Sequence, residues 1–136
     1  MKRLSMPLVS VLVALAAGCG VGPHVDDYNE SLVAAALASC ACGNIGYSSE
    51  EECREDAPPS AGEQACVEAL FKNAEGDYEA QLDCRTAVQN RLANCLNSKA
   101  CTDLARLGCA GEALEDEADC PDLPNDINNE LRQCLD

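Results

Sequence analysis

Aromatic side chains and histidine are scarce in this 136-residue sequence. It has no tryptophan, and its four aromatic residues, Tyr28, Tyr47, Phe71 and Tyr78, make up 3% of the chain. A chain with so few large side chains buries little apolar area per residue, and a small core stabilises a fold only weakly. We therefore expect a second source of stability beside the hydrophobic core.

Positive charge is also scarce. Nine Lys and Arg residues stand against 24 Asp and Glu residues, which gives a formal net charge of −15. A protein this acidic is repelled by nucleic-acid phosphates and by anionic lipid headgroups. The composition therefore argues against nucleic-acid binding and against membrane binding through a basic patch.

The usual catalytic motifs are missing. His24 is the single histidine, so a nucleophile activated by an oriented imidazole has one poor candidate in a segment that we expect to be a tether. Nucleotide-binding glycine loops, the G-x-S-x-G motif and the H-E-x-x-H motif are absent from the sequence. The acidic runs 50–52 and 115–117 are typical of solvated helix faces rather than of two carboxylates held in different environments. The sequence predicts no catalytic residue and no enzyme.

Metal-binding motifs are equally weak. No C-x-x-C pair occurs, and Cys40 and Cys42 are too close in sequence for a zinc knuckle. The acidic segment 112–122 lacks the regular spacing of a calcium loop. We expect no metal ligands and no cofactor, and a metal on the acidic segment stays an alternative.

The first eighteen residues have the three parts of an export signal. Lys2 and Arg3 give a positive start, and an almost wholly apolar run follows from residue 4 to 17. That run is shorter than the roughly twenty residues that span a bilayer, and it ends in small residues, as a cleaved segment does. An ordinary secretory signal and a retained transmembrane helix are the alternatives.

The end of this signal resembles the lipobox of bacterial lipoproteins. Its residues are Leu15-Ala16-Ala17-Gly18-Cys19. Ala16 stands where Leu is usual, and small residues are accepted there. The resemblance implies cleavage between Gly18 and Cys19, diacylglycerol on the Cys19 thiol and often an acyl chain, such as palmitate, on the new amine. It also implies a lipid anchor in the bacterial cell envelope, with Gly20 favouring the outer membrane.

Cysteine is abundant, with eleven in the chain. Removing Cys19 as the lipid carrier leaves an even set, as a fully disulfide-bonded exported domain requires. Export to an oxidising compartment favours disulfides, and each contributes about 2–4 kcal/mol by constraining the unfolded chain. The disulfide candidates are Cys40, Cys42, Cys53, Cys66, Cys84, Cys95, Cys101, Cys109, Cys120 and Cys134.

The sequence predicts three segments: a signal peptide (1–18), the lipidated cysteine with a short tether (19–25), and a cysteine-rich helical domain (26–136). No strand pattern occurs. The apolar periodicity and the capping signals predict an all-α, compact bundle of about five to six short helices cross-linked by disulfides. The predicted helices cover about 26–42, 48–56, 60–74, 77–97, 98–108 and 125–135, with a less regular acidic segment at 110–122.

Spacing suggests some disulfide pairs and leaves the connectivity open. Cys66 and Cys84 lie opposite each other across a turn at 75–76, and Cys95 and Cys101 are symmetric about Ser98. Three C-x10-C spacings also occur, at 42–53, 84–95 and 109–120. Eleven residues are about three helical turns, so Cys84 and Cys95 share a helix face and must each pair with a neighbouring element. The other two spans cross a Gly or Pro break and permit a local bridge.

The function predicted from these features is non-catalytic. We expect a protein-interaction or structural role at the membrane, with an envelope protein as partner. The lipobox and the cysteine density resemble those of the cysteine-rich lipoproteins of unknown function of some Gram-negative bacteria, and this resemblance carries no functional residue beyond Cys19. Binding of a small ligand or a metal in the periplasm is the alternative. An inhibitor of proteases would be one form of the first role.

Overall fold

The computed structural model describes residues 20–41, 46–99 and 101–136, and this part of the chain forms six α-helices and no strand. The all-α prediction is confirmed. The helices are α1 (Gly22–Cys40), α2 (Glu50–Asp56), α3 (Ala61–Asn73), α4 (Glu79–Ser98), α5 (Asp103–Ala118) and α6 (Asn125–Cys134). Residues 1–19, 42–45 and 100 lie outside the described part, so the predicted signal peptide and Cys19 lie outside it too.

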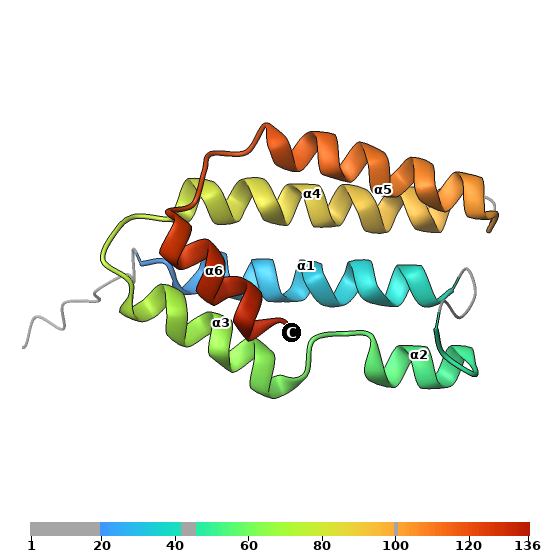
Figure 1. The fold of residues 1–136 in the computed structure, drawn as a ribbon, viewed down its shortest axis with the longest axis horizontal. Helices are drawn as coiled ribbons and strands as arrows, with labels where there is room; N and C mark the ends of the chain where they lie inside the picture. The colour runs from blue at the N-terminus through green and yellow to red at the C-terminus, as the bar shows by residue number, and fades with distance from the viewer. Residues whose placement is uncertain (1–19, 42–45, 100) are drawn as a thin grey trace, which may run out of the picture.

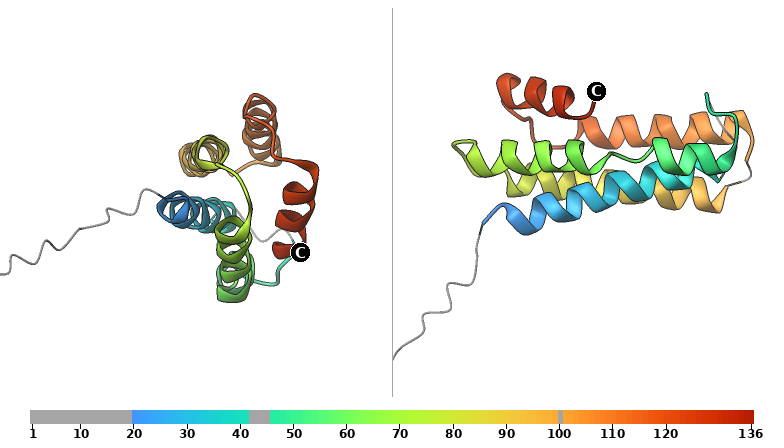
Figure 2. Two further views of the ribbon diagram at one scale, coloured as in Figure 1. Left: turned by 90° about the vertical axis from the view of Figure 1, so that its left-hand side faces the viewer. Right: turned by 90° about the horizontal axis from the view of Figure 1, so that it is seen from below.

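The helix α1 is the central element of the bundle. It runs alongside α4, with which it makes its most extensive contact, and α2 and α3 pack on its other side (Figure 1). The helix α5 covers the outer side of α4, and α6 crosses over α3 at an angle (Figures 1 and 2). The order of the packed helices across the bundle is therefore α5, α4, α1 and then α2 with α3.

The main hydrophobic core lies where α1, α3, α4 and α6 meet. Phe71 and Tyr78 pack edge to face, with ring centroids 5.8 Å apart and an interplanar angle of 63°. Three of the four aromatic residues of the chain thus lie in this one cluster. Its buried members are Val25, Tyr28, Val67, Phe71, Tyr78, Leu82, Leu123, Ile127, Leu131 and Cys134.

A glycine is required in the turn between α3 and α4. Gly76 has a φ of +147°, and a Cβ atom added there would lie 2.8 Å from the Tyr78 ring. The Tyr78 hydroxyl donates a 3.0 Å hydrogen bond to the carbonyl of Glu75, so the ring cannot move away without losing that bond. The predicted turn at 75–76 is confirmed as part of a bend at 74–76, and its glycine lets the aromatic core close over the chain.

A second, smaller core joins the other ends of α1, α4 and α5. Its buried members are Ala35, Ala38, Ala93, Leu96 and Cys109. Three alanines and one leucine remove far less apolar surface from water than the aromatic cluster does. This half of the bundle therefore gains less from apolar packing, and the Cys40–Cys53 and Cys95–Cys109 disulfides cross-link its helices.

Capping signals correctly identified one helix start and misplaced another. The Ser60 side chain accepts a 3.2 Å bond from the Glu63 amide, and the Glu63 carboxylate accepts one of 2.6 Å from the Ser60 amide, so this predicted capping box is confirmed. The expected box at Ser48 is displaced by one residue, because Ser49 is the N-cap and accepts from the Glu52 amide. The Glu52 carboxylate instead binds the amide and hydroxyl of Ser48.

The helix α1 begins earlier than predicted. It begins at Gly22, with Pro23 in its first turn, and the expected caps Asp26 and Asp27 lie inside it. Pro is favoured in a first turn because its missing N–H has no helical partner there and its φ is already helical. Val25, predicted to be part of a flexible tether, is fully buried in the main core. The tether is thus at most a few residues long.

The helix α5 is also longer than predicted. Ser98 ends α4 instead of capping the next helix, and Thr102 caps α5 by accepting from the Ala105 amide. Gly108 does not end α5, which continues through the acidic segment to Ala118. Ion pairs with α4 hold this acidic half in place, because Arg85 pairs with Glu117, and Arg91 Nε lies 2.8 Å from Asp116 Oδ2.

Candidate functional site

A cluster of ion pairs lies where the start of α1 packs against the start of α4. This end of the bundle is close in sequence to the predicted lipid anchor. His24 Nδ1 lies 2.5 Å from Asp83 Oδ1, and His24 Nε2 lies 3.7 Å from Glu79 Oε2. The expectation that His24 lies in a tether is wrong, because α1 begins before it and packs beside α4. The cluster links the first turn of α1 to the first two turns of α4.

The His24 cluster predicts a pH-dependent stability. The hydrogen bond to Asp83 raises the pKa of His24 above its ordinary value of 6.5, and the charges of Asp83, Glu79 and Asp27 add to this rise, although burial opposes it. Because the folded pKa is raised, the stabilisation is fully present below about pH 6.5 and is lost as the pH rises through the raised pKa. We expect His24→Gln to lower the melting temperature in acid and to have little effect in alkali.

The measurement is a series of thermal unfolding curves across that pH range. Asp83→Asn is the matched variant, since it removes the main partner of the imidazole, and it should reproduce the acid-specific loss. A melting-temperature difference for His24→Gln that is equal in acid and in alkali would contradict the ion-pair interpretation.

Two disulfides cross-link α4 to α5 and to the segment just after α5. Cys84 pairs with Cys120, and Cys95 pairs with Cys109, each with Cα atoms 5.7 Å apart. Cys84 and Cys95 are eleven residues apart on α4, and Cys109 and Cys120 are eleven residues apart on α5 and just beyond its end. Because the two helices run antiparallel, the first cysteine of one span pairs with the last cysteine of the other. The expectation that Cys84 and Cys95 each bind a neighbouring element is confirmed. The expected pairs Cys95–Cys101 and Cys109–Cys120 are wrong.

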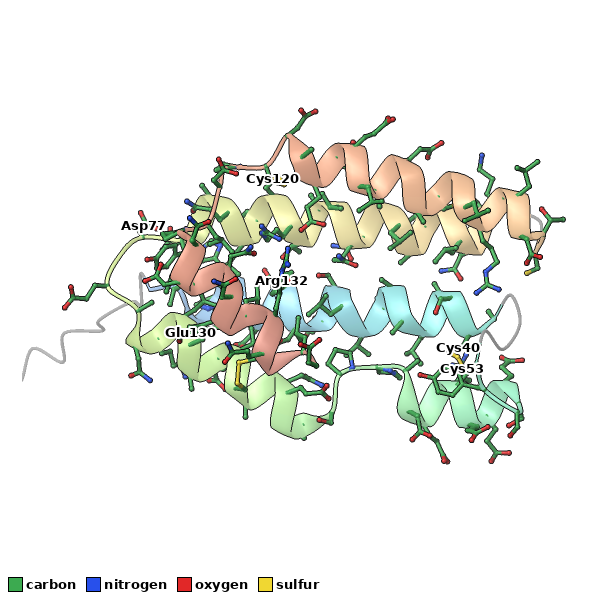
Figure 3. All side chains as sticks on the ribbon, in the orientation of Figure 1. Cys40, Cys53, Asp77, Cys120, Glu130 and Arg132 are labelled. Carbon is green, nitrogen blue, oxygen red and sulfur yellow. A yellow bond between two sulfur atoms is a disulfide. The ribbon has the colours of Figure 1, made fainter. Side chains whose placement is uncertain are left out.

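The remaining described disulfides close the other side of the bundle. Cys40 at the end of α1 pairs with Cys53 of α2 (Figure 3), and Cys66 of α3 pairs with Cys134 of α6. The suggested pairs Cys42–Cys53 and Cys66–Cys84 are therefore wrong. Cys101 is also disulfide-bonded. The sulfur atoms of these bonds are not thiolate ligands, so the nine described cysteines offer no zinc site.

The clearest exposed apolar feature lies on α5. Leu104, Leu107 and Leu114 are 82%, 70% and 68% exposed, respectively. With Gly111 they follow an i, i+3, i+7, i+10 spacing, so the four residues share one side of the helix. We call this surface the α5 leucine face. Leu104 and Leu107 lie within the predicted helix 98–108, and no local sequence signal marks them as exposed.

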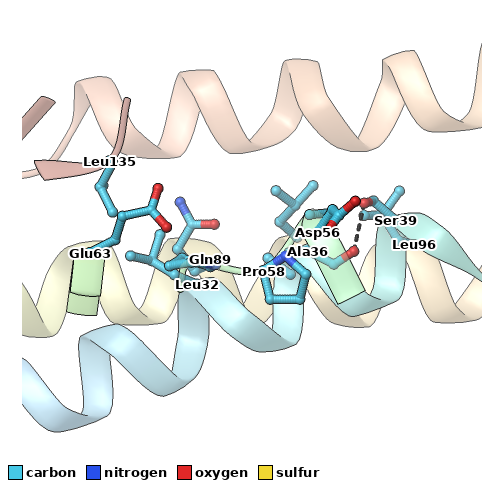
Figure 4. A pocket seen from close by; sticks show the side chains of 13 residues that line it. Leu32, Ala36, Ser39, Asp56, Pro58, Glu63, Gln89, Leu96 and Leu135 are labelled. Carbon is cyan, nitrogen blue, oxygen red and sulfur yellow. Dashed lines mark hydrogen bonds between the residues drawn. The ribbon is translucent and has the colours of Figure 1, made fainter. Parts of the chain in front are cut away.

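The α5 leucine face continues into a pocket between α5, α4 and α1. Leu107 contributes to this cavity of about 520 Å³, whose other lining residues are Ser39, Leu92, Leu96, Asp103, Arg106 and Ala110. A second cavity of about 500 Å³ adjoins it, because Ser39, Leu92 and Leu96 line both. The second cavity extends past Pro58 to Glu63 and Leu135 (Figure 4). The two neighbouring pockets thus share part of their lining, and the more apolar one begins beside the exposed Leu107.

The acidic residues do not converge on a metal. No group of three or more His, Cys, Asp and Glu side chains among the described residues is arranged to hold an ion. In the segment 112–122, where calcium was the alternative, Asp116 and Glu117 are paired with arginines of α4. Of the helices in the described part, none is both long enough and apolar enough to cross a membrane.

The shifted pKa values of Tyr28, Glu52 and Glu63 have local causes in the described part of the chain. The pKa of Tyr28 is raised because its hydroxyl is largely buried, with the charge of Arg85 opposing this rise. The lowered pKa values of Glu52 and Glu63 come from the hydrogen bonds that they accept from Ser48 and Ser60 at helix starts. These shifts belong to packing and capping, and the best-formed candidate site is the α5 leucine face with its pocket. No protein-family model matches this sequence, and no curated protein or solved structure is similar enough to it to assign a family.

Proposed function

We propose that the chain is a lipoprotein of the bacterial cell envelope, anchored by acyl chains on Cys19, whose helical domain binds another envelope protein without catalysing a reaction. The observation that carries the anchor is the cysteine count. Eight cysteines form four disulfides, and Cys101 is bonded as well. Cys19 and Cys42 are the other two of the eleven cysteines, and both lie outside the described residues.

The surroundings of Cys101 favour Cys42 as its partner. Cys101 Sγ lies 3.8 Å from the carbonyl oxygen of Ala41, the residue directly before Cys42. A disulfide joins Cα atoms that are about 4.4–6.8 Å apart, so a partner next to Ala41 in the chain fits the requirement. Cys42 and Cys19 both lie outside the described residues; we propose Cys42 as the partner of Cys101 and Cys19 as the thiol that the lipobox resemblance assigns to lipid.

The lipid anchor would hold the domain close to the membrane. Helix α1 begins at Gly22, three residues after Cys19, and three residues reach only about 10 Å when extended. Without Lys2 and Arg3 the charge of the mature chain falls from −15 to −17. Anionic headgroups repel such a domain, so the acyl chains would supply the attachment. Two or more acyl chains are needed for durable binding, because one gives only marginal affinity.

The interaction role rests on the α5 leucine face. Three leucines that are each more than two-thirds exposed on one side of a helix, next to an apolar pocket, are typical of a surface that a partner covers. We expect a photo-crosslinking amino acid at Leu107 or Leu114 to form a discrete adduct with one protein in the native host. The same amino acid at the exposed Glu55 of α2 is the matched control and should give no such adduct.

The two arms of this experiment separate the outcomes. Adducts that recur with the same protein at both leucines, and not at Glu55, support a protein-interaction role at this face. Absence of any adduct at the leucines under several growth conditions would overturn that role. The anchor is tested separately, by the fatty-acid labelling described below.

A second candidate function is the binding of a small apolar ligand. The pocket of about 520 Å³ beside Leu107 lies within the range of about 300–1,000 Å³ that is usual for small-molecule sites. Native mass spectrometry of the purified protein tests it. A recurrent added mass that disappears when Leu92→Phe fills the pocket would favour this candidate, and its absence would count against it.

A further inference from the structure

The α5 leucine face carries a charge pattern that restricts what can cover it. The helix holds five acidic residues, Asp103, Glu112, Glu115, Asp116 and Glu117, and one basic residue, Arg106. Asp103, Glu112 and Glu115 are exposed and belong to no ion pair within the described residues. Glu115 is eleven residues from Leu104, about three turns, so the two share nearly the same side of α5. Asp103 and Glu115 thus border the leucines with negative charge that no described residue pairs with, whereas Glu112 lies farther round the helix, toward Cys95 of α4.

Two glycines of α5 make no close packing contact with the described part of the chain. Gly108 and Gly111 have ordinary negative φ values, and a Cβ atom added to either would meet nothing within 4 Å. A glycine inside a helix costs about 1 kcal/mol relative to alanine, and neither packing nor backbone conformation within the chain explains that cost here. Gly111 lies between Leu107 and Leu114 on the leucine face, where a missing side chain leaves room for an apolar side chain from outside.

The negative charge of the chain disfavours two other binding partners at the α5 leucine face. A second copy of the chain would bring another strongly acidic surface against it, and like charges across an interface cost affinity. An anionic lipid surface is repelled for the same reason. A cationic partner gains from the same field, both in its rate of association and in its orientation.

On these grounds we propose that the α5 leucine face docks a cationic amphipathic helix of another protein. The helix would lie along α5 for about three turns, the distance from Leu104 to Leu114 at about 1.5 Å per residue. Its apolar side chains would contact the leucines and fill the gap at Gly111. Its Lys and Arg residues would face Asp103 and Glu115. The inference rests on the proposed protein-interaction function, because it names the chemistry of the partner at the same face.

The test uses the lipidated, oxidised chain in nanodiscs of zwitterionic lipid. The probe is a fluorescent helical peptide of about four turns, with leucines on one side and lysines on the other. A peptide with the same composition in scrambled order and one with glutamates in place of the lysines are the ligand controls. Empty nanodiscs correct for binding to lipid. We expect the amphipathic cationic peptide alone to bind well, with an affinity that falls as salt rises.

Four variants assign that binding to the α5 leucine face. Leu107→Asp should weaken it about tenfold, because an apolar contact is lost from the centre of the interface. Glu115→Lys should weaken it a few-fold at low salt, whereas the same charge reversal at Glu55 of α2 should not change it. Gly111→Ala should raise the melting temperature of the protein and yet weaken binding, because the added methyl group stabilises the helix and occupies the gap.

The possible outcomes distinguish a failure of the cationic-helix proposal from a failure of the protein-interaction function on which it rests. Equal binding of the scrambled peptide, or no loss with Leu107→Asp and Gly111→Ala, would overturn the cationic-helix proposal. Self-association of the chain, or binding to anionic vesicles, that Leu107→Asp abolishes would also overturn it and would identify the other occupant. Crosslinking at Leu107 in cells to a partner segment that is neither helical nor basic would reject this inference and leave the interaction role standing.

Discussion

Replacing Cys19 with serine is expected to abolish the labelling of the protein with radioactive fatty acid and to release it from the membrane fraction or leave it uncleaved. The serine hydroxyl does not replace the thiol to which diacylglycerol is joined in the lipoproteins that this N-terminus resembles. The effect should be all or none, because the strongly acidic domain offers no second means of attachment. Labelling of whole cells followed by immunoprecipitation measures it.

The control for this experiment is the removal of another cysteine. A chain with both Cys66→Ala and Cys134→Ala loses one disulfide and should still be labelled, since the lipid site is elsewhere. Unchanged labelling of the Cys19→Ser variant would contradict the lipid anchor. An ordinary secretory signal, the alternative, predicts no labelling of the unmodified chain either.

The second large effect should come from the disulfide that holds α6. We expect the double variant Cys66→Ala and Cys134→Ala to lower the free energy of unfolding by about 4 kcal/mol. This bridge joins residues 68 apart in the chain, and a path through the Cys84–Cys120 bond shortens the loop to about 32 residues. Cys134 also belongs to the main core beside Ile127 and Leu131, so α6 would lose its covalent link to α3. Chemical denaturation under oxidising conditions measures the change.

The matched control is the disulfide between Cys40 and Cys53. It spans 13 residues, for which the loss of loop-closure entropy predicts about 3 kcal/mol. It joins α1 to the short α2, away from the aromatic core, so its removal should destabilise the protein less than the removal of Cys66–Cys134. A larger loss for Cys40–Cys53 would show that the alanine-rich half of the bundle, rather than α6, limits stability.

Helix boundaries illustrate where local sequence signals were sufficient. The capping box at Ser60 and Glu63 and the apolar spacing of Ile127, Leu131 and Cys134 predicted α3 and α6 correctly, because both signals lie within one helix. The end of α5 was wrong for the opposite reason. Its acidic half is held by Arg85 and Arg91, which come from another helix, and no signal within the segment itself records them.

Part of the disulfide pattern could be predicted from the sequence. The C-x10-C spacing recurs at 84–95 and at 109–120. On two antiparallel helices, cysteines with equal spacings can form two disulfides, first to last and last to first. Recognising this requires knowing that α5 packs antiparallel on α4 and runs past Gly108. Because the predicted break near Gly108 separated the two halves of α5, the Cys109–Cys120 spacing was interpreted as a local bridge.

The sequence by itself determined the all-helical class, the dependence on disulfides and the expectation of a lipidated Cys19, because composition, periodicity and the lipobox are properties of neighbouring residues. Only the tertiary structure decided which cysteines pair and where α1 begins, and only it placed His24 beside Asp83. It also decided that Leu104, Leu107 and Leu114 remain exposed, because a leucine at helical spacing is buried or exposed according to which other helix packs over it. In this bundle α4 covers the opposite side of α5, and in the described part of the chain nothing covers the leucine face.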